Sequence, residues 1–528
     1  MGLPRVSYAD GIRKHQAVQF GGYNHNLYAG DGEIWDMENL TSDLFPLLSS
    51  RRPRYKLRTL AKPNGFYARD GLYWVDGTGF YRDGVLKGTV TDGRKQFESL
   101  GAYIVILPDM AYYNVMTDVF GSINAAWSGA AVIEDGTYVG ESAKANTIRA
   151  QDVSWDTYFK AGDAVTISGA QAHPENNMTL VIREIDGDKL RFYENSFVIG
   201  ETGDSESALT VSRTAPELDF ICQNENRLWG CRGDEIYASK LGDIFNWNVF
   251  DGLTTDSYAV SVGSAGDFTA ACSYLGYPVF FKEDMIYKVY GDRPGNFQVM
   301  SSASLGVEAG SHASLAIAGE ILFYQSRAGI VAYSGGIPQP VCDAFGTVRY
   351  KNAVGGSNAR KYYVSMEDAE GSWSLFAYDT GRGLWHREDS LHAIGFGWSG
   401  ELHFLDADGN IWLSGDARTV PQGAQTEGPL ESMAEFGDFV EADPNRKGST
   451  KLQLRIEADA GAQVTVLIQF DSDGVWHTVQ VLETETKKSF YLPIIPRRSD
   501  HFRLRLEGRG GWRLYSLVRE SYSGSEIH

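Results

Sequence analysis

A β-hairpin that returns about every 40 residues constrains this chain more than any other feature. In each copy a strand rich in aromatic and aliphatic residues leads through a short polar turn into a second strand, with the two-residue alternation of a β-strand. The copies are RLWGCRGDEIYAS (227–239), YPVFFKEDMIYKVYG (277–291), EILFYQSRAGIVAYSGG (320–336), KYYVSMEDAEGSWSLFAYD (361–379) and ELHFLDADGNIWLSG (401–415). They begin near residues 228, 279, 321, 362 and 402, so their separations are 51, 42, 41 and 40 residues. Such a period is typical of four-stranded propeller blades.

Two more hairpins lie upstream, at 64–84 and 100–115. They bring the number to about seven and predict six to eight blades. The 28 Tyr, 26 Phe and 12 Trp suit half-buried strands, and the 59 Gly suit tight turns. We therefore predict an all-β fold with a β-propeller, in which residues 1–60 lead into the blades and offer a strand that completes the last one.

Two regions interrupt the repeat. Within 119–215, the segments AGDAVTISG (161–169) and MTLVIREIDGDKLRFYENSF (178–197) predict an inserted small β-barrel domain. After residue 451, six strictly alternating segments predict a C-terminal antiparallel β-sandwich with one wet face. The predicted division is 1–118 for the N-terminal segment and first blades, 119–215 for the insert, 216–415 for the remaining blades, 416–450 for a linker and 451–528 for the sandwich.

The formal net charge of -20 is spread unevenly. Residues 446–528 hold 13 Lys and Arg against 10 Asp and Glu, which is +3 and leaves -23 on residues 1–445. A chain this acidic is not expected to bind nucleic acid through its phosphates, because such binding requires clustered Lys and Arg. An acidic wall can still enclose DNA without binding it, and the plainer interpretation is that acidity maintains solubility.

We find no apolar run near the ~18 residues of a membrane span. Residues 1–10 lack the apolar core of a secretory signal. We therefore expect no membrane-spanning segment and folding in the cytoplasm.

Few residues suggest chemistry. The four Cys (Cys222, Cys231, Cys272, Cys342) form no C-x-x-C pair, so buried free thiols are expected. Patterns for a nucleophile elbow, a phosphate loop and H-E-x-x-H are missing. His386, His392 and His403 lie in adjacent hairpins and carry a metal hypothesis, against which stand ordinary hydrogen-bonded imidazoles.

Two Asp-rich loops, 406–410 and 471–474, resemble fragments of calcium loops, but Gly comes fourth and not sixth. Asp-Gly between alternating strands predicts hairpin turns instead. A glycosidase needs two carboxylates at a fixed separation, and 68 Asp and Glu offer too many pairs to choose one. We therefore predict no catalytic, cofactor-binding or metal-binding residue, no cofactor, and a protein that is not an enzyme.

The segment NRLWGCRGDEIYASKLGDIFNW (226–247) resembles one in the propeller-like tail proteins of tailed bacteriophages, called phage stabilisation or tail nozzle proteins. The matching residues are Asn226, Arg227, Leu228, Trp229, Ile236, Tyr237, Ser239, Leu241, Gly242, Asp243 and Asn246. Residues 161–197 are similar to small β domains of tail-tube and nozzle proteins, and 497–520 to the last domain of comparable prophage proteins. The likeness covers the middle half of the chain well and the ends loosely, and its motifs are structural.

The resemblance implies a virion tail protein made in the host cytoplasm. Six copies would form a ring below the portal and adaptor, beside tail fibre, spike or needle proteins, with genomic DNA passing through the lumen unbound. The alternative is a host cell-wall glycan-binding or depolymerising tail protein, and a third is a bacterial propeller scaffold without a phage role. In each case Arg232-Gly233-Asp234 is predicted to be a hairpin turn, not an adhesive tripeptide.

Overall fold

The computed structural model describes residues 12–137, 142–193, 196–440, 446–494 and 497–523. Regular structure in these ranges is strand, apart from short 3-10 turns: η1 (Trp155–Thr157), η2 (Pro174–Asn176), η3 (Pro294–Asn296), η4 (His312–Ser314) and η5 (Asp343–Phe345). None of the helices described is long and apolar enough to cross a membrane. Two compact units divide the chain: one runs up to Leu72 and resumes at Glu308, and the other is Tyr73–Val307.

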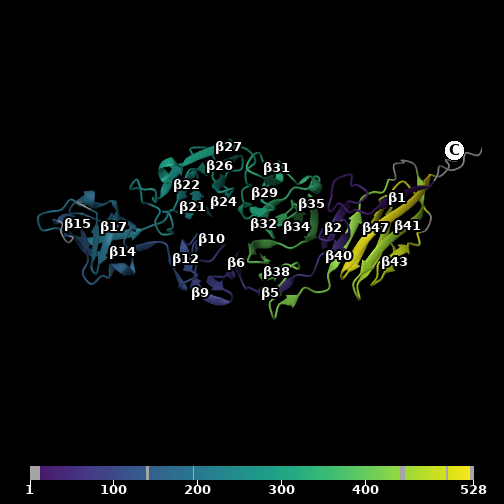
Figure 1. Cartoon of the computed structure of the whole chain (residues 1–528), viewed down its shortest axis with the longest axis horizontal. Helices are drawn as coiled ribbons and strands as arrows, with labels where there is room; N and C mark the ends of the chain where they lie inside the picture. The colour runs from purple at the N-terminus through teal and green to yellow at the C-terminus, as the bar shows by residue number, and fades with distance from the viewer. Residues whose placement is uncertain (1–11, 138–141, 194–195, 441–445, 495–496, 524–528) are drawn as a thin grey trace, which may run out of the picture. The chain divides into compact units, whose positions relative to one another are not determined.

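The repeating hairpins are the central pairs of antiparallel sheets (Figure 1). Two of these sheets precede the insert: β6 (Pro63–Ala68), β7 (Leu72–Asp76), β8 (Gly79–Arg82) and β9 (Val85–Thr89); β10 (Gln96–Leu100), β11 (Tyr103–Leu107), β12 (Ala111–Asn114) and β13 (Val119–Ser122). Two follow it: β20 (Phe220–Asn224), β21 (Arg227–Arg232), β22 (Glu235–Ala238) and β23 (Tyr258–Ser261); β24 (Ala270–Tyr274), β25 (Tyr277–Phe281), β26 (Met285–Tyr290) and β27 (Gln298–Ala303). Each is a four-stranded meander, the form of a propeller blade.

Three further sheets of this kind come after Glu308. They are β28 (Ala316–Ala318), β29 (Ile321–Ser326), β30 (Gly329–Tyr333) and β31 (Gln339–Pro340); β32 (Lys351–Ser357), β33 (Lys361–Glu367), β34 (Trp373–Asp379) and β35 (Leu384–Asp389); and β36 (Ala393–Trp398), β37 (Leu402–Asp406) and β38 (Asn410–Leu413) with β5 (Tyr55–Thr59) and β39 (Gln425–Thr426). The expected N-terminal strand is confirmed, because β5 pairs β38 in the register Asn410↔Thr59 to Leu413↔Tyr55.

The first strands of successive blades pack on one another, as expected for the inner strands of a propeller. In one unit β10 packs on β20 and β20 on β24; in the other β28 packs on β32, β32 on β36 and β36 on β6. The strand after each inner strand is buried on both faces, which is why segments such as β33 read as nearly continuous apolar runs. The described chain thus has the predicted all-β propeller fold.

The insert is a closed barrel of six strands in the order β14 (Ala125–Gly136), β15 (Lys144–Arg149), β18 (Lys189–Phe192), β17 (Thr179–Asp186), β16 (Ala164–Ser168) and β19 (Asp204–Arg213). Its own apolar cluster holds Trp155, Ile133, Ile148 and Val211. The barrel confirms the predicted insert between the second and third blades.

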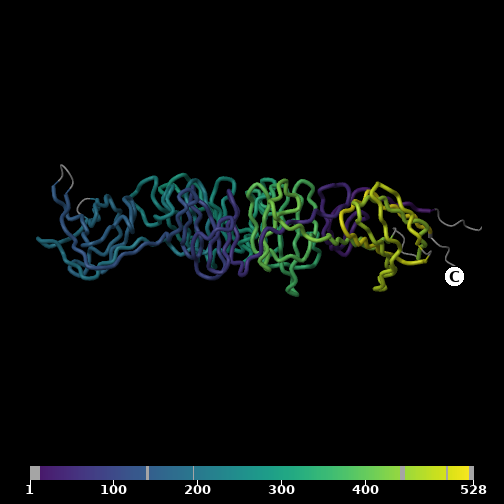
Figure 2. The backbone as a smooth tube through the Cα atoms, turned by 90° about the horizontal axis from the view of Figure 1, so that it is seen from below, coloured from purple at the N-terminus to yellow at the C-terminus, as the bar shows by residue number. Residues whose placement is uncertain are grey.

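The C-terminal sandwich has two sheets. One joins β3 (Leu40–Thr41), β4 (Leu48–Ser50), β47 (Trp512–Ser523), β41 (Lys447–Ala458) and β44 (Lys488–Tyr491), with β1 (Arg13–Ala17) on β47 and β45 (Arg498–Ser499) on β41. The other is β2 (Ile34–Glu38), β40 (Glu431–Phe436), β46 (Phe502–Arg509), β42 (Gln463–Phe470) and β43 (His477–Leu482). In Figures 1 and 2 the purple N-terminal segment accordingly lies beside the yellow C-terminal strands.

The structure differs from the predicted division in two places. Four strands from residues 13–50 belong to the sandwich and not to the first blades, and part of the predicted linker 416–450 forms β40. The physical reason is burial: Ile34 of β2 and Phe436 of β40 are paired neighbours, and both are inaccessible to solvent in one apolar cluster. Short strands from distant parts of the sequence complete the sheets, a pairing that local alternation does not reveal.

Candidate functional site

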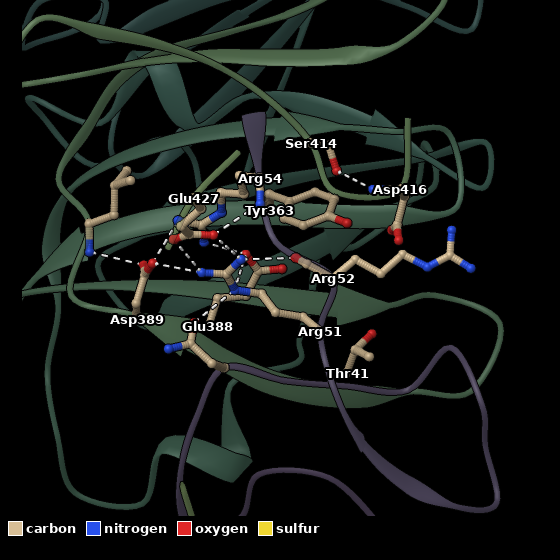
Figure 3. A network of polar contacts seen from close by, with 12 residues as sticks. Thr41, Arg51, Arg52, Arg54, Tyr363, Glu388, Asp389, Ser414, Asp416 and Glu427 are labelled. Atoms are coloured by element: carbon tan, nitrogen blue, oxygen red, sulfur yellow. Dashed lines mark hydrogen bonds and ion pairs between the residues drawn. The ribbon is translucent and has the colours of Figure 1, made fainter. Parts of the chain in front are cut away.

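A buried network of ion pairs lies where the chain passes from the sandwich into the last blade (Figure 3). Arg51 follows β4, and Arg54 precedes β5. Two nitrogens of Arg54 lie 2.6 Å from Glu388 Oε2 and Asp389 Oδ2 at the end of β35. Arg51 makes a two-pronged contact with Glu427, at 2.8 and 2.9 Å. The network therefore ties the chain between β4 and β5 to a blade edge and to the segment after β39.

The charges in this network hold one another in ionised form. Burial opposes ionisation of Asp389, but the charges of Arg54 and Arg51 outweigh burial and hold its pKa below the usual range. Burial also opposes ionisation of Glu427, and the hydrogen bonds and charge of Arg51 lower its pKa. The Arg54 side chain is 4% exposed and is balanced by carboxylates on two sides. In this set of charges each guanidinium has carboxylate partners, so removing one partner would leave a buried charge uncompensated.

A small cavity adjoins the network. Its volume of about 20 Å³ holds one water molecule and is far smaller than a sugar ring. Two of the three carboxylates that line it have opposite shifts. Burial and the charge of Asp43 raise the pKa of Asp416, whereas Lys361, 2.7 Å from Asp43, overcomes the effect of burial and lowers the pKa of Asp43. Carboxylates with diverging pKa values are the groups used in general acid–base chemistry.

The three histidines of the metal hypothesis have separate partners. His386 is 4% exposed, and burial lowers its pKa to about 3, so it is neutral at physiological pH. Nδ1 of His403 lies 3.0 Å from the carbonyl oxygen of Glu401. The ring of His392 stacks on Trp373 with centroids 3.5 Å apart. Across the described ranges no group of three or more His, Cys, Asp or Glu is placed to hold a metal ion.

The Arg-Gly-Asp triplet is a hairpin turn, as predicted. Arg232 ends β21, Glu235 begins β22, and Gly233 has a φ of 57°, which favours glycine. The Asp234 carboxylate accepts a hydrogen bond of 2.7 Å from Ser261 on the neighbouring strand. Cys231 is inaccessible beside this turn, and burial raises the pKa of its thiol. The stretch supports the blade and offers no reactive group.

The residues that carry the phage-tail resemblance have structural tasks. Arg227 is 2% exposed and donates hydrogen bonds to the carbonyl oxygens of Ser239 at 2.8 Å and Thr254 at 2.9 Å. The amide of Gly242 donates to the carbonyl of Asn226 at 2.7 Å. These contacts hold the long connection between β22 and β23 against the start of β21.

The same connection docks the inserted barrel. Asn246 donates to the Asp163 carboxylate at 3.0 Å and accepts from the backbone of Ala164 at 2.9 Å. Asp163 is also paired with Arg213, and all three side chains are buried. The sequence analysis did not predict this contact between the connection and the barrel. The sequence feature that corresponds to it is Leu241-Gly242-Asp243 followed by Asn246. The motif therefore describes how a blade carries its insert.

One surface of the sandwich differs from these buried networks. The outer face of the sheet with β41, β44 and β47 exposes Tyr491, 66% of whose surface is accessible. The ammonium group of Lys451 lies 4.8 Å from the centre of the Tyr491 ring, and that of Lys487 lies 4.2 Å from the Tyr515 ring. We call this surface the tyrosine face, defined by Lys14, Lys451, Arg455, Glu457, Asp459, Lys487, Tyr491, Arg513, Tyr515 and Glu520.

The tyrosine face is basic, in contrast to the acidic chain. Its five cations (Lys14, Lys451, Arg455, Lys487, Arg513) outnumber its three carboxylates (Glu457, Asp459, Glu520), a balance of 5 - 3 = +2 against -20 for the whole chain. The carboxylates are engaged: Glu457 accepts from the Tyr515 hydroxyl at 2.6 Å, and Glu520 lies 3.5 Å from Lys451. The face thus combines one exposed aromatic ring, that of Tyr491, and one half-buried ring, that of Tyr515, with an excess of positive charge.

Comparison with known proteins identifies no family. No family model matches the sequence, and neither does any curated protein. Solved structures give distant likenesses. One is an exo-β-1,3-galactanase from Phanerochaete chrysosporium with galactose, at 10% identity over 57% of this chain and 94% of that one, with a TM-score of 0.22. A GH43 glycoside hydrolase engineered for endo-xylanase and exo-arabinofuranosidase activity shares 9% identity over 58% and 97%, with a TM-score of 0.21.

A third likeness is the extracellular domain of a one component system from B. thetaiotaomicron, at 8% identity over 90% of this chain and 95% of that one, with a TM-score of 0.19. At such scores and identities these likenesses carry no assignment of activity. The prediction that the chain is not an enzyme is nevertheless contradicted, because two of the structures described above are named as a galactanase and a glycoside hydrolase.

Proposed function

We propose that this chain is a cell-wall glycan-binding protein, acting as a tail protein of a tailed bacteriophage, and that the tyrosine face is its binding surface. The exposure of Tyr491 is the observation that carries the proposal. A tyrosine ring pairs an apolar face with a polar tip, and such a ring beside hydrogen-bond donors suits a sugar, which has an apolar ring face and a rim of hydroxyl groups. The resemblance of residues 226–247 supports the tail assignment.

A glycan array probed with the full chain and with Tyr491→Ala tests this function. We expect the full chain to retain a set of cell-wall glycans and Tyr491→Ala to lose about tenfold in affinity for them. The control is Tyr277→Ala, which removes a half-exposed tyrosine from the other unit. Phe490, which neighbours Tyr491, would not serve as a control because it packs against the core. Equal binding by the full chain and Tyr491→Ala would refute the assignment of the surface.

Release of reducing ends from the bound glycans, measured in the same samples, shows whether binding leads to cleavage. Release would show that the chain is also an enzyme, and binding without release would leave it a binding protein.

A second candidate is a tail nozzle or hub that forms a ring.

 The observation that favours it is the charge of -20, because an acidic lumen lets DNA slide without adhering. The resemblance implies six copies with head-to-tail contacts that close a ring. Negative-stain microscopy of the purified protein tests this candidate: sixfold rings would support it, and a persistent monomer in the presence of its adaptor would refute it.

A further inference from the structure

We propose that the glycan held by the tyrosine face is a polyanion, a chain that carries carboxylate, sulfate or phosphate groups at intervals along its length. This inference rests on the proposed glycan-binding function and names the chemical class of its ligand. Three features of the face lead to it: the excess of positive charge, the spacing of the cations along β41, and the exposed ring between them.

The charge of the face is complementary to an anionic chain. Arg455 is exposed, and Lys451 is half-buried. The net +2 of the face lies on a protein whose first 445 residues carry -23. Acidic surfaces elsewhere on the chain repel a polyanion, so the face is where one is attracted. The positive charge of the face would not increase its affinity for a neutral glycan.

The spacing of the cations favours a chain over a small ion. Lys451 and Arg455 lie on the same face of β41, four residues apart, which is about 13 Å at about 3.3 Å per residue. One small anion cannot contact both side chains closely at that separation. Tyr491 is paired with Gln453, midway between the two cations, and Ser489 with Arg455. An anionic glycan laid along β41 would place a sugar on the ring and its charged groups near the cations on either side.

The density of charge favours a glycan over nucleic acid. Duplex DNA carries one negative charge per about 1.7 Å, and its binding depends on dense clusters of Lys and Arg. The tyrosine face has five cations, of which Lys451 and Arg513 are paired with carboxylates. Such a surface matches a polymer with one charge per one or two sugars, and the remainder of this acidic chain would repel a duplex.

The test measures binding of the full chain to immobilised polymers in matched pairs. Polygalacturonate is compared with its methyl ester, and dextran sulfate with dextran. Hyaluronan and poly(glycerol phosphate) extend the range of anionic groups, and a 20-nucleotide single-stranded DNA represents nucleic acid. Each is measured at low and high salt, because charge-driven binding weakens as salt screens it.

The variants are Arg455→Ala, Arg455→Lys and Lys351→Ala. Arg455→Ala removes a cation from the face, Arg455→Lys keeps the charge, and Lys351→Ala removes an exposed cation from β32 as the matched control. We expect at least one anionic glycan to bind at least tenfold more tightly than its neutral partner or than DNA. Arg455→Ala should weaken that binding at least fivefold, while Arg455→Lys and Lys351→Ala stay within twofold of the unaltered chain.

Other outcomes overturn the inference in distinguishable ways. If neutral and anionic polymers bind equally and Tyr491→Ala loses both, the glycan-binding function is supported and the proposal of an anionic ligand is refuted. Tighter binding of DNA than of every glycan would overturn both. Equal weakening by Arg455→Ala and Lys351→Ala would show that only the overall charge matters, and no binding to any anionic polymer would also refute the inference.

Discussion

Two regions of the molecule contain the same kinds of charged residue but differ in what these residues do. One is the junction network around Arg51 and Arg54, and the other is the tyrosine face. At the junction, buried guanidinium groups are matched by Glu388, Asp389 and Glu427 at hydrogen-bonding distance. On the tyrosine face, cations outnumber carboxylates and lie beside the exposed ring of Tyr491 and the half-buried ring of Tyr515. The comparison shows that burial and charge balance, and not residue type, separate a structural contact from a surface able to bind a partner.

The largest expected effect breaks the junction. Arg54→Ala removes the closer of the two guanidinium groups beside Glu388 and Asp389 and leaves only Arg51, at 3.9 and 3.5 Å, so we expect a loss of about 3 kcal/mol in the free energy of unfolding of the unit that contains them. Thermal unfolding followed by circular dichroism measures the loss. The control is Arg52→Ala, an exposed neighbour, which should stay within about 0.5 kcal/mol. Equal effects of the two variants would contradict the assignment of the network.

A second buried joint extends the comparison to the barrel. Asp163→Asn keeps the shape of the side chain but removes the charge that faces Arg213, and we expect a loss of about 2–3 kcal/mol. Limited proteolysis should then cleave the barrel faster than the blades. Glu175→Gln, which alters an exposed carboxylate in the same barrel, is the control. Unchanged cleavage in Asp163→Asn would show that the joint contributes little.

Acid should weaken the junction in a defined direction. The pKa values of Asp389 and Glu427 are lowered in the folded chain, so their stabilising contribution is fully present above their unfolded values, about 4. It is lost as the pH falls through the folded values. The difference in melting temperature between the unaltered chain and Arg54→Ala should therefore shrink from pH 6 to pH 3. A difference that stays constant over this interval would argue against a charged network.

The tyrosine face should respond in the opposite way to the junction. Because Tyr491 is mostly exposed, Tyr491→Ala should change the free energy of unfolding by no more than about 0.5 kcal/mol. Its expected tenfold loss of glycan affinity corresponds to about 1.4 kcal/mol of binding free energy. Calorimetry and thermal unfolding of the same sample measure both quantities. A large loss of stability would mean that the ring belongs to the fold.

The smallest expected effect concerns the Arg-Gly-Asp turn. Asp234→Ala removes one exposed hydrogen bond from Ser261 and should leave the melting temperature nearly unchanged, with glycan binding also unchanged. Thermal unfolding and the glycan array measure both. Substantial loss of glycan binding in this variant would assign the turn a role in recognition that its position in the hairpin does not indicate.

Much of the fold could be predicted because its signals are local. The alternation in segments such as 361–379 and the polar turns between their strands depend on residues close in sequence, so the blades, the barrel insert and most sandwich strands were predicted. The pairing of β2 with β40 joins residues about 400 positions apart. No local pattern reports such a pair, and the short strands from residues 13–50 were therefore not assigned to the sandwich.

The site was harder to predict for a related reason. The alternation of KLQLRIEA shows that Lys451 and Arg455 face outward, but not which rings or carboxylates lie beside them. Arg51 and Arg54 read in the sequence as solvated charges, and only their approach to Glu388, Asp389 and Glu427 makes them a buried network. Likewise, the role of Asn246 depends on Asp163, which lies 83 residues away in the insert.

The sequence by itself determined the strands, their turns and the repeat, because side-chain alternation and turn chemistry act over a few residues. It also determined the separation of an acidic chain from a basic C-terminal module. Only the tertiary structure decided which charges are buried in balanced pairs and which remain in excess on a surface. Charge balance depends on distances between side chains, and folding sets those distances between residues far apart in the sequence.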